Sequence, residues 1–280
     1  MSVHSEHPSS ELVDERDATA NVAAREVESS TRPSISRRLF YWWALLTAAL
    51  LLVILGAPAI LLSLLTRRNL VYRVAVRGGR IWLRLIGVKV HVKGSENLAP
   101  DKTYVLISNH RSYLDPPALL TSIKKRLGFI AKKELLRVPV LGQGMMYVNA
   151  VAIDRGRSAS AIQRMQAATE RLHSGVSFVV FAEGTRARVG ELLPFKKGGF
   201  YMAIQAGMSI APVAIKNTDR LMGKGTSEAG PGTIEITILP PVETEGFSTE
   251  EDVEHLIEKV RAMIKSELGV KSVPPVVAEG

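Results

Sequence analysis

A histidine and an aspartate between Ile107 and Pro116 have the types and the spacing needed for general-base catalysis. A neutral imidazole accepts a proton from a hydroxyl when a carboxylate holds its other ring nitrogen. His110 would be the base and Asp115 its partner, provided that the residues between them form a turn. A structural interpretation competes, because Asp115 before a proline is a good helix N-cap and Ser112 has the spacing of a capping box with it.

The residues on either side of this motif predict the elements that would position it. The apolar run 104–107 predicts a buried strand that ends at Ser108 and Asn109, and residues 118–123 predict a helix. His110 and Asp115 would then lie at the carboxyl end of a strand, where open α/β sheets bind ligands.

A second strand-to-turn junction, FVVFAEGTR, runs from Phe178 to Arg186. Gly184 permits the turn, and the guanidinium of Arg186 has the geometry to hold a phosphate through two hydrogen bonds. Glu183 is placed to position that arginine or a substrate hydroxyl. The alternative is a surface turn with a structural ion pair.

Three weaker motifs lie elsewhere in the chain. Arg155 follows a short apolar strand and is a second candidate for holding phosphate, and the run FKKGG at 195–199 precedes a helix whose N-terminus favours an anion. Pro212 within a strand-like run predicts an edge strand, a bulge or a pocket wall. Taken alone, each of these motifs is more readily explained by structure than by function.

Composition and charge narrow the class of protein. The 280 residues contain no cysteine, which excludes disulfides, thiolate metal sites and an acyl-cysteine intermediate. The formal net charge of +9 favours anionic partners. Residues 37–86 carry eight arginines and no acid, beside a long apolar segment, whereas residues 1–36 have a net charge of −4. This distribution favours a membrane over nucleic acid as the partner.

The apolar segment comprises 27 uncharged residues, 39–65, between two arginine pairs. As one helix it would be about 40 Å long, which is enough to span a hydrocarbon core of about 30 Å with tilt. Pro58, after Gly56, allows a second solution, in which the chain breaks and returns as a re-entrant hairpin. The sequence leaves both open.

The same segment also resembles an export signal, because Arg37 and Arg38 precede an apolar run. The run is too long and lacks a clean cleavage site, so retention as an anchor is favoured. The segment 69–86 follows, and four of its arginines share one helical face, namely Arg73, Arg77, Arg80 and Arg84. This pattern predicts a basic amphipathic helix in the headgroup layer. The alternative is an ordinary solvated face, and Gly78 and Gly79 weaken any helix there.

From residue 87 to residue 269 strands and helices alternate, which predicts a single α/β domain with a mixed sheet flanked by helices. Residues 1–36 and 270–280 are predicted to be disordered tails. The strands are predicted at 88–93, 103–108, 127–131, 150–153, 177–181, 210–215 and 233–239. The helices are predicted at 116–125, 139–147, 158–174, 197–206 and 249–268.

Taken together, the motifs resemble those of the glycerolipid acyltransferases of the 1-acyl-glycerol-3-phosphate acyltransferase type. That family has four ordered blocks, namely NHxxxxD, a block ending in arginine, FPEGTR and a proline-centred apolar block. Here they correspond to Asn109–Asp115, Val151–Arg155, Phe181–Arg186 and Ile210–Val213. AKKEL at 131–135 and FKKG at 195–198 also match, and the resemblance covers about residues 85–245. Ala182 stands where the family usually has proline, and the second block is loose before its arginine.

The resemblance implies transfer of a fatty acyl group from acyl-CoA or acyl-carrier protein to a lysophosphatidic acid, giving phosphatidic acid. It implies that His110 is the base and Asp115 its orienting partner, with no cofactor or metal. The absence of a GxSxG motif and of cysteine favours direct transfer. The resemblance also implies a phosphate site. This site would be formed by Arg186, Arg155, Glu183, Gly184, Thr185 and Lys196 and supported by Asn109, Lys132 and Pro212.

Several alternatives stay open. Within the class, the acceptor is a phosphorylated glycerol, another lysophospholipid, a lyso-ornithine lipid or a glycolipid precursor. A hydrolase or transacylase would use the same base, and a non-catalytic lipid-binding protein would need neither His110 nor Asp115. We expect the chain at the cell membrane with its catalytic domain on the cytoplasmic face, because thioester donors are cytosolic and the arginines at 67–84 follow the positive-inside tendency.

Overall fold

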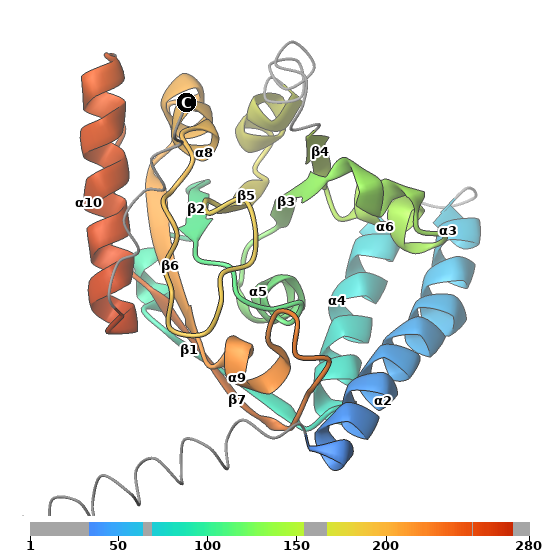
Figure 1. Cartoon of the computed structure of the whole chain (residues 1–280). Helices are drawn as coiled ribbons and strands as arrows, with labels where there is room; N and C mark the ends of the chain where they lie inside the picture. Colours follow the sequence, from blue (N-terminus) through green and yellow to red (C-terminus); the bar gives the residue numbers. More distant parts are fainter. Residues whose placement is uncertain (1–33, 64–68, 154–166, 248, 271–280) are drawn as a thin grey trace, which may run out of the picture.

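A sheet of seven strands forms the centre of the computed structural model, which describes residues 34–63, 69–153, 167–247 and 249–270 (Figure 1). The strands follow the spatial order β1-β7-β6-β2-β5-β3-β4. Their bounds are β1 Val88–Lys93, β2 Val105–Ser108, β3 Leu127–Lys132, β4 Val151–Ile153, β5 Ser177–Phe181, β6 Ile210–Lys216 and β7 Gly232–Ile238.

The sheet is mixed, as predicted. The pairs β1–β7, β6–β2, β2–β5, β5–β3 and β3–β4 are parallel, whereas β6 and β7 run antiparallel. β2 is buried along its whole length, and Val105 and Ile107 face one apolar cluster while Leu106 faces the other. A strand that is covered on both faces needs an unbroken apolar sequence, which is what residues 105–107 provide.

Helices cover both faces of the sheet. On one face, α4 (Asn69–Leu85) and α5 (Asp115–Ser122) bury Leu83 and Leu119, while on the other α8 (Gly198–Ala206) and α10 (Glu250–Leu268) bury Phe200 and Val260 (Figure 1). The remaining α-helices between residues 86 and 247 with printed bounds are α6 Leu141–Tyr147 and α9 Thr218–Met222.

The predicted elements form, with differences at their ends. The helix expected at 116–125 stops at Ser122, because Ile123 is extended and the Lys125 ammonium contacts the carbonyl oxygens of Ala99, Pro100 and Lys102. The helix expected at 158–174 lies partly outside the described residues, and 167–173 of it are helical. The short helix α9 was not predicted.

The N-terminal apolar segment is one continuous helical run. It consists of α2 (Ile35–Leu51), the π-helical turn η1 (Leu52–Gly56) and α3 (Ala57–Ser63). Of the two alternatives that the sequence left open, the break at Pro58 is therefore not the one that forms. Proline clashes with the carbonyl four residues earlier in an α-helix, and the wider π-turn before Pro58 offers relief from that clash without a reversal of the chain.

The chain reverses after this helix instead, so that α4 packs back along α2 (Figure 1). The indole N–H of Trp82 on α4 donates to the carbonyl oxygen of Ala44 on α2 at 2.9 Å. The predicted helix at 69–86 thus forms despite its two glycines, and its four arginines are exposed. The predicted tails fall mainly on residues that are not described, although Ile35 and Ser36, placed in the first tail, already belong to α2.

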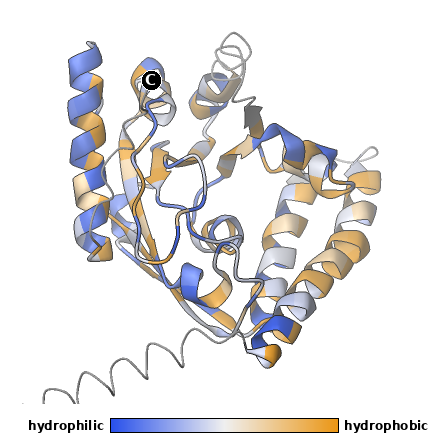
Figure 2. Ribbon diagram, viewed as in Figure 1, coloured by the Kyte–Doolittle hydropathy of each residue, from blue (hydrophilic) through white to orange (hydrophobic). Residues whose placement is uncertain are grey.

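The run 35–63 is 29 residues long and by length and composition alone is apolar enough to cross a membrane. Its outer surface exposes large apolar side chains, including Leu39, Trp42, Ile54 and Leu61. The ribbon of this run is mostly orange to white, the colours of hydrophobic and intermediate residues (Figure 2). The described residues contain only one such helix. Unlike a core helix, it is mostly unburied, so its sequence fits a lipid environment.

Candidate active site

His110 and Asp115 meet at the carboxyl end of β2. His110 Nδ1 lies 2.8 Å from Asp115 Oδ2, and the Asp115 side chain is completely buried while that of His110 is 19% exposed. Asp115 is the first residue of α5, so the strand, a short loop and the helix together bring the two side chains into contact.

The loop between them is organised around the Asp115 carboxylate. Its Oδ2 atom also accepts the backbone N–H groups of Arg111 at 2.7 Å and Ser112 at 2.8 Å. Only one half of the alternative capping box forms, the bond from Ser112 N–H to Asp115, because the Ser112 hydroxyl accepts from Leu114 N–H and donates to the carbonyl of Met222. The carboxylate therefore stabilises the loop that carries His110 rather than the first turn of α5.

The imidazole of His110 is held in one orientation. Its ring stacks on Phe181 at the end of β5, with 4.1 Å between the ring centroids and 21° between the planes. In the tautomer that donates Nδ1–H to Asp115, Nε2 carries a lone pair, and it has no hydrogen-bond partner among the described residues. The geometry meets the requirement for a general base.

Glu183 holds the backbone of His110 through a hydrogen bond. Its Oε1 atom accepts the backbone N–H of His110 at 2.7 Å and its Oε2 atom accepts that of Leu193 at 2.8 Å. The residue is 2% exposed, and burial raises its pKa to about 7, although the two hydrogen bonds and the nearby Arg111 oppose the rise. Glu183 thus accepts hydrogen bonds from two backbone groups, and it does not position Arg186, which was one of the two roles considered for it.

Asn109 and Pro212 connect β2 to its neighbour β6. The Asn109 side chain donates to the carbonyl oxygen of Ile215 at 2.9 Å and accepts the N–H of the same residue at 2.8 Å. Pro212 is buried and pairs with Ile107 in the interior of the sheet. The expectation of an edge strand is therefore wrong. The antiparallel pairing of β6 with β7 begins only at Val213, one residue later.

Arg186 lies on the outer side of this site. Its guanidinium lies over the ring of Tyr113, 3.7 Å from the centroid. Gly184 turns the chain before it with φ +70°, and a Cβ atom there would lie 2.9 Å from the Lys196 side chain. Thr185 and Lys196 are exposed. These four residues place two cations and a hydroxyl beside the loop that carries His110.

Two groups of this site were not predicted from the sequence. Lys224 donates to the carbonyl oxygen of Arg186 at 2.8 Å and adds a third cation. Arg111 forms a buried ion pair with Asp219 on α9 at 3.1 Å and donates to the carbonyl of Glu191 at 2.8 Å. Asp219 lies 108 positions from Arg111 and belongs to no recognised motif, so only the fold reveals the pair.

The other candidates lie apart or are not described. Lys132 is exposed at the end of β3, and the structure gives it no contact with His110 or Asp115. Arg155 lies outside the described residues. Among the residues that are described, no group of three or more histidine, aspartate or glutamate side chains is placed to hold a metal ion.

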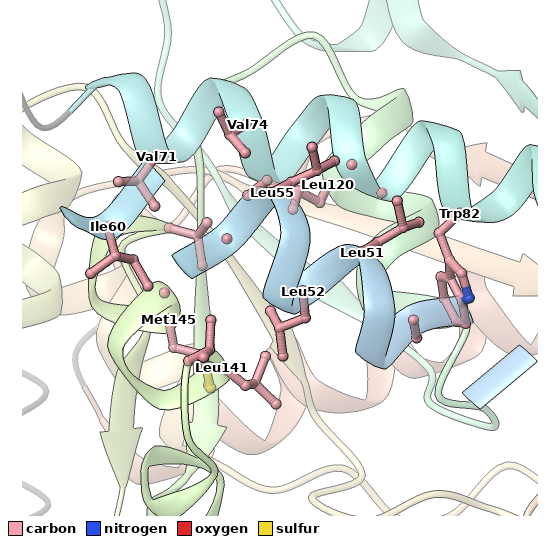
Figure 3. Close-up of a pocket in the computed structure, with 18 of the residues that line it drawn as sticks. Leu51, Leu52, Leu55, Ile60, Val71, Val74, Trp82, Leu120, Leu141 and Met145 are labelled. Carbon is pink, nitrogen blue, oxygen red and sulfur yellow. The ribbon is translucent and has the colours of Figure 1, made fainter. Parts of the chain in front are cut away.

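A separate apolar cavity of about 380 Å³ lies between the α2–α3 run, α4 and α6 (Figure 3). The α2–α3 run and α4 together form a helical hairpin. Side chains from both arms of this helical hairpin and from α5 and α6 line the cavity, among them Leu52, Leu55, Val74, Leu120, Leu141 and Met145. Its volume falls in the range of about 300–1,000 Å³ that is typical of ligand sites, and its lining has the chemistry to accept a hydrocarbon chain.

Comparison with known proteins places this site in a family. A family model described as Acyltransferase matches residues 89–216. The chain is 36% identical over 178 residues to the 1-acyl-sn-glycerol-3-phosphate acyltransferase alpha of Homo sapiens, which is 63% of this chain and 62% of that protein. It is 34% identical over 181 residues to the 1-acyl-sn-glycerol-3-phosphate acyltransferase of Limnanthes douglasii, covering 64% and 63%.

The fold agrees with a solved structure. The crystal structure of the 1-acyl-sn-glycerophosphate (LPA) acyltransferase PlsC from Thermotoga maritima superposes with a TM-score of 0.71 at 30% identity, covering 84% of this chain and 97% of that one. The chain therefore belongs to the acyltransferase family that contains the 1-acyl-sn-glycerol-3-phosphate acyltransferases. Its aligned region spans 62% of the human relative's length.

Proposed function

We propose that this protein transfers a fatty acyl group from a thioester, acyl-CoA or acyl-carrier protein, to the free hydroxyl of 1-acyl-glycerol 3-phosphate. The product would be phosphatidic acid. The observation that carries this proposal is the contact of 2.8 Å between His110 Nδ1 and the buried Asp115 carboxylate at the end of β2. Family membership supports the choice of acceptor, because the relatives above carry that activity in their names.

The proposed reaction uses the hydrogen-bonded pair of His110 and Asp115. Nε2 of His110 removes the proton of the acceptor hydroxyl while that oxygen attacks the thioester carbonyl carbon. Asp115 holds the tautomer and stabilises the imidazolium that forms. The tetrahedral intermediate then expels the thiolate as the carbon–sulfur bond breaks, and the imidazolium returns its proton to the sulfur. Direct transfer needs no covalent enzyme intermediate.

The cations beside His110 are proposed to hold the phosphate of the acceptor. Arg186 provides a planar guanidinium whose position is set by Tyr113, while Lys196 and Lys224 flank the same turn. Gly184 and Thr185 shape that turn and Glu183 fixes the backbone of His110. The phosphate role that was predicted for Arg155 stays a prediction, since that residue is not described.

The α2–α3 run is proposed to lie within one leaflet of the membrane rather than to cross it. Both of its ends are joined to the catalytic domain. The Arg37 side chain donates to the backbone carbonyl of Arg220 at 2.7 Å, and the Ser63 hydroxyl donates to the Tyr147 hydroxyl at 2.8 Å. A helix crossing the bilayer would carry one of these contacts to the far side. It would also take exposed arginines of α4 into hydrocarbon, at about 2.5–3.5 kcal/mol each near the centre. We place the catalytic domain on the cytoplasmic face.

The first test compares the wild type with His110→Ala in detergent, using oleoyl-CoA and 1-acyl-glycerol 3-phosphate, with products identified by mass. We expect phosphatidic acid from the wild type and a rate lower by about 10²–10⁴ in the variant, the usual contribution of a general base. Free fatty acid without an acylated acceptor would indicate a hydrolase. Binding of lysophosphatidic acid without any turnover, with either type of thioester donor, would indicate a non-catalytic lipid-binding protein.

A further inference from the structure

A second, strongly basic pocket lies away from the active site. It has a volume of about 570 Å³ and is formed by the outer face of α4 and by the segment that connects α5 to β3. That segment follows the last residue of α5, whereas Asp115 is the first, so the helix separates this pocket from His110. No carboxylate lines the pocket, but five cations do: Arg73, Arg80, Lys124, Lys125 and Arg126.

Backbone carbonyl groups hold two of these cations in place. Arg80 donates from Nε and Nη2 to the carbonyl oxygen of Thr121 at 3.1 and 3.0 Å. Lys125 contacts three backbone carbonyls, and the guanidinium of Arg126 lies 5.6 Å from the ring centroid of Tyr72. The carbonyl partners of Arg80 and Lys125 are neutral, so they orient these two cations without cancelling their charge. Asp101 acts on Lys125, and the four cations Arg73, Arg80, Lys124 and Lys125 still outnumber this one acid.

The two walls of the pocket are fixed to each other. The Tyr72 hydroxyl on α4 accepts the backbone N–H of Leu127, where β3 begins, at 2.9 Å. The bonds from Arg80 to Thr121 join α4 to the end of α5 at a second point. A basic site that is organised before its ligand arrives loses little conformational entropy on binding.

The location of the pocket indicates the source of the anion. α4 is the second arm of the helical hairpin. It packs against α2, whose outer surface is exposed and apolar. A helix of this kind lies at the depth of the lipid headgroups, where the phosphates of the bilayer are found. Anionic lipids attract nearby lysine and arginine side chains electrostatically.

We propose that this pocket binds the phosphate headgroup of an anionic membrane phospholipid, separately from the lipid on which the protein acts. Arg73 and Lys124 are exposed on opposite walls, where they would contact the phosphate from two sides. Lys125 and Arg80 provide the surrounding positive field. The bound lipid would connect α4 and the α5–β3 segment to the bilayer as a further point of attachment beside the α2–α3 run.

The test measures binding to the detergent-solubilised full chain by titration calorimetry, with no acyl donor present. The ligands are dioctanoyl phosphatidylglycerol, dioctanoyl phosphatidylcholine and inorganic phosphate. The double variant Arg73→Gln/Lys124→Gln removes two cations that line the pocket. Its matched control is Arg77→Gln/Arg84→Gln, which removes the same charge from exposed positions of α4 that do not line it.

We expect saturable binding of phosphatidylglycerol that is at least about tenfold weaker in Arg73→Gln/Lys124→Gln and nearly unchanged in the control, since each lost charge-assisted hydrogen bond weakens affinity strongly. Arg186→Gln should also retain the affinity. The proposal would be overturned if phosphatidylcholine or free phosphate bound equally well, if both double variants lost affinity alike, or if Arg186→Gln abolished binding. Because no turnover is measured, failure here is separate from failure of the proposed acyl transfer.

Discussion

At the residue scale, His110, the proposed base, is positioned mainly through hydrogen bonds to the backbone of its loop. Asp115 accepts from the imidazole and from two backbone N–H groups, and Glu183 accepts the backbone N–H of His110 itself. Each carboxylate thereby fixes a different part of the same loop. The buried pair of Arg111 and Asp219 joins that loop to α9, and breaking such a pair is expensive because the remaining charge stays buried.

The raised pKa of Glu183 predicts that the stability of the protein depends on pH. Burial raises its pKa from 4.5 to about 7, so the folded state holds this proton more tightly than the unfolded state. The resulting stabilisation is fully present below pH 4.5 and is lost as the pH rises through about 7. We expect the free energy of unfolding to fall by at most about 3 kcal/mol over this interval from this group.

Glu183→Gln should remove that dependence. The amide cannot ionise, so thermal unfolding in detergent between pH 4.5 and 8 should show a flatter profile. The variant should also be less stable at low pH by about 1–3 kcal/mol, because the amide NH₂ faces a backbone N–H that the carboxyl group had accepted. Glu258→Gln, at an exposed position, serves as the control. An unchanged slope in Glu183→Gln would contradict the assignment.

Among the elements, the contact of α4 with α5 explains one of the two consecutive glycines in α4. A Cβ atom on Gly79 would lie 2.9 Å from Thr121 Cγ2 on α5, whereas one on Gly78 would lie 3.6 Å from Leu55 Cδ1, an ordinary contact. Gly79 is thus needed for the close approach of the two helices, and Gly78 is not. This approach brings Arg80 within reach of the Thr121 carbonyl and so shapes the basic pocket.

Two alanine substitutions in α4 should therefore have opposite effects on stability. Gly78→Ala should raise the free energy of unfolding by about 0.5–1 kcal/mol, since alanine is the better helix former. Gly79→Ala should lower it by about 1–2 kcal/mol, because overpacking against Thr121 exceeds that gain. Thermal unfolding in detergent measures both. Adding Thr121→Ser to Gly79→Ala removes the clashing methyl group and should restore stability. Equal effects of the two alanines would refute this explanation.

At the scale of the whole molecule, the helical hairpin lies along the catalytic domain instead of projecting from it (Figure 1). Its exposed side is apolar from Leu39 to Leu61. In the proposed placement, this apolar side of the α2–α3 run faces the bilayer, and the candidate active site is joined to it through α4 and α5. An acceptor that lives in the membrane would then reach His110 without leaving it.

Depth-dependent quenching by brominated phosphatidylcholine tests this arrangement. Single tryptophans would be placed near the start, middle and end of the run by keeping Trp42 alone, or by introducing Ile54→Trp or Leu61→Trp with all native tryptophans replaced by phenylalanine. All three positions are exposed. A helix lying in one leaflet predicts similar depths for the three, whereas a helix crossing the bilayer places position 54 deepest. The second pattern would overturn the proposed placement.

The sequence by itself determined the order of the strands and helices along the chain and the main candidates for the site. Residues 105–107 and 177–181 predicted buried strands, and the apolar segment predicted membrane association. These features are local, because periodicity, caps and unbroken apolar runs depend on neighbours in the chain. His110 and Asp115 are only five positions apart, so their contact also follows from one loop.

Tertiary structure alone decided which distant residues meet. The pairing of Arg111 with Asp219, the attachment of Lys224 to Arg186 and the interior position of Pro212 all depend on how β6 and α9 pack beside β2. The course of the hairpin was undecided in the sequence for a similar reason. A proline in a helix is compatible with a break or with an accommodating π-turn, and the structure shows the π-turn together with contacts from both ends of the helix to the rest of the protein.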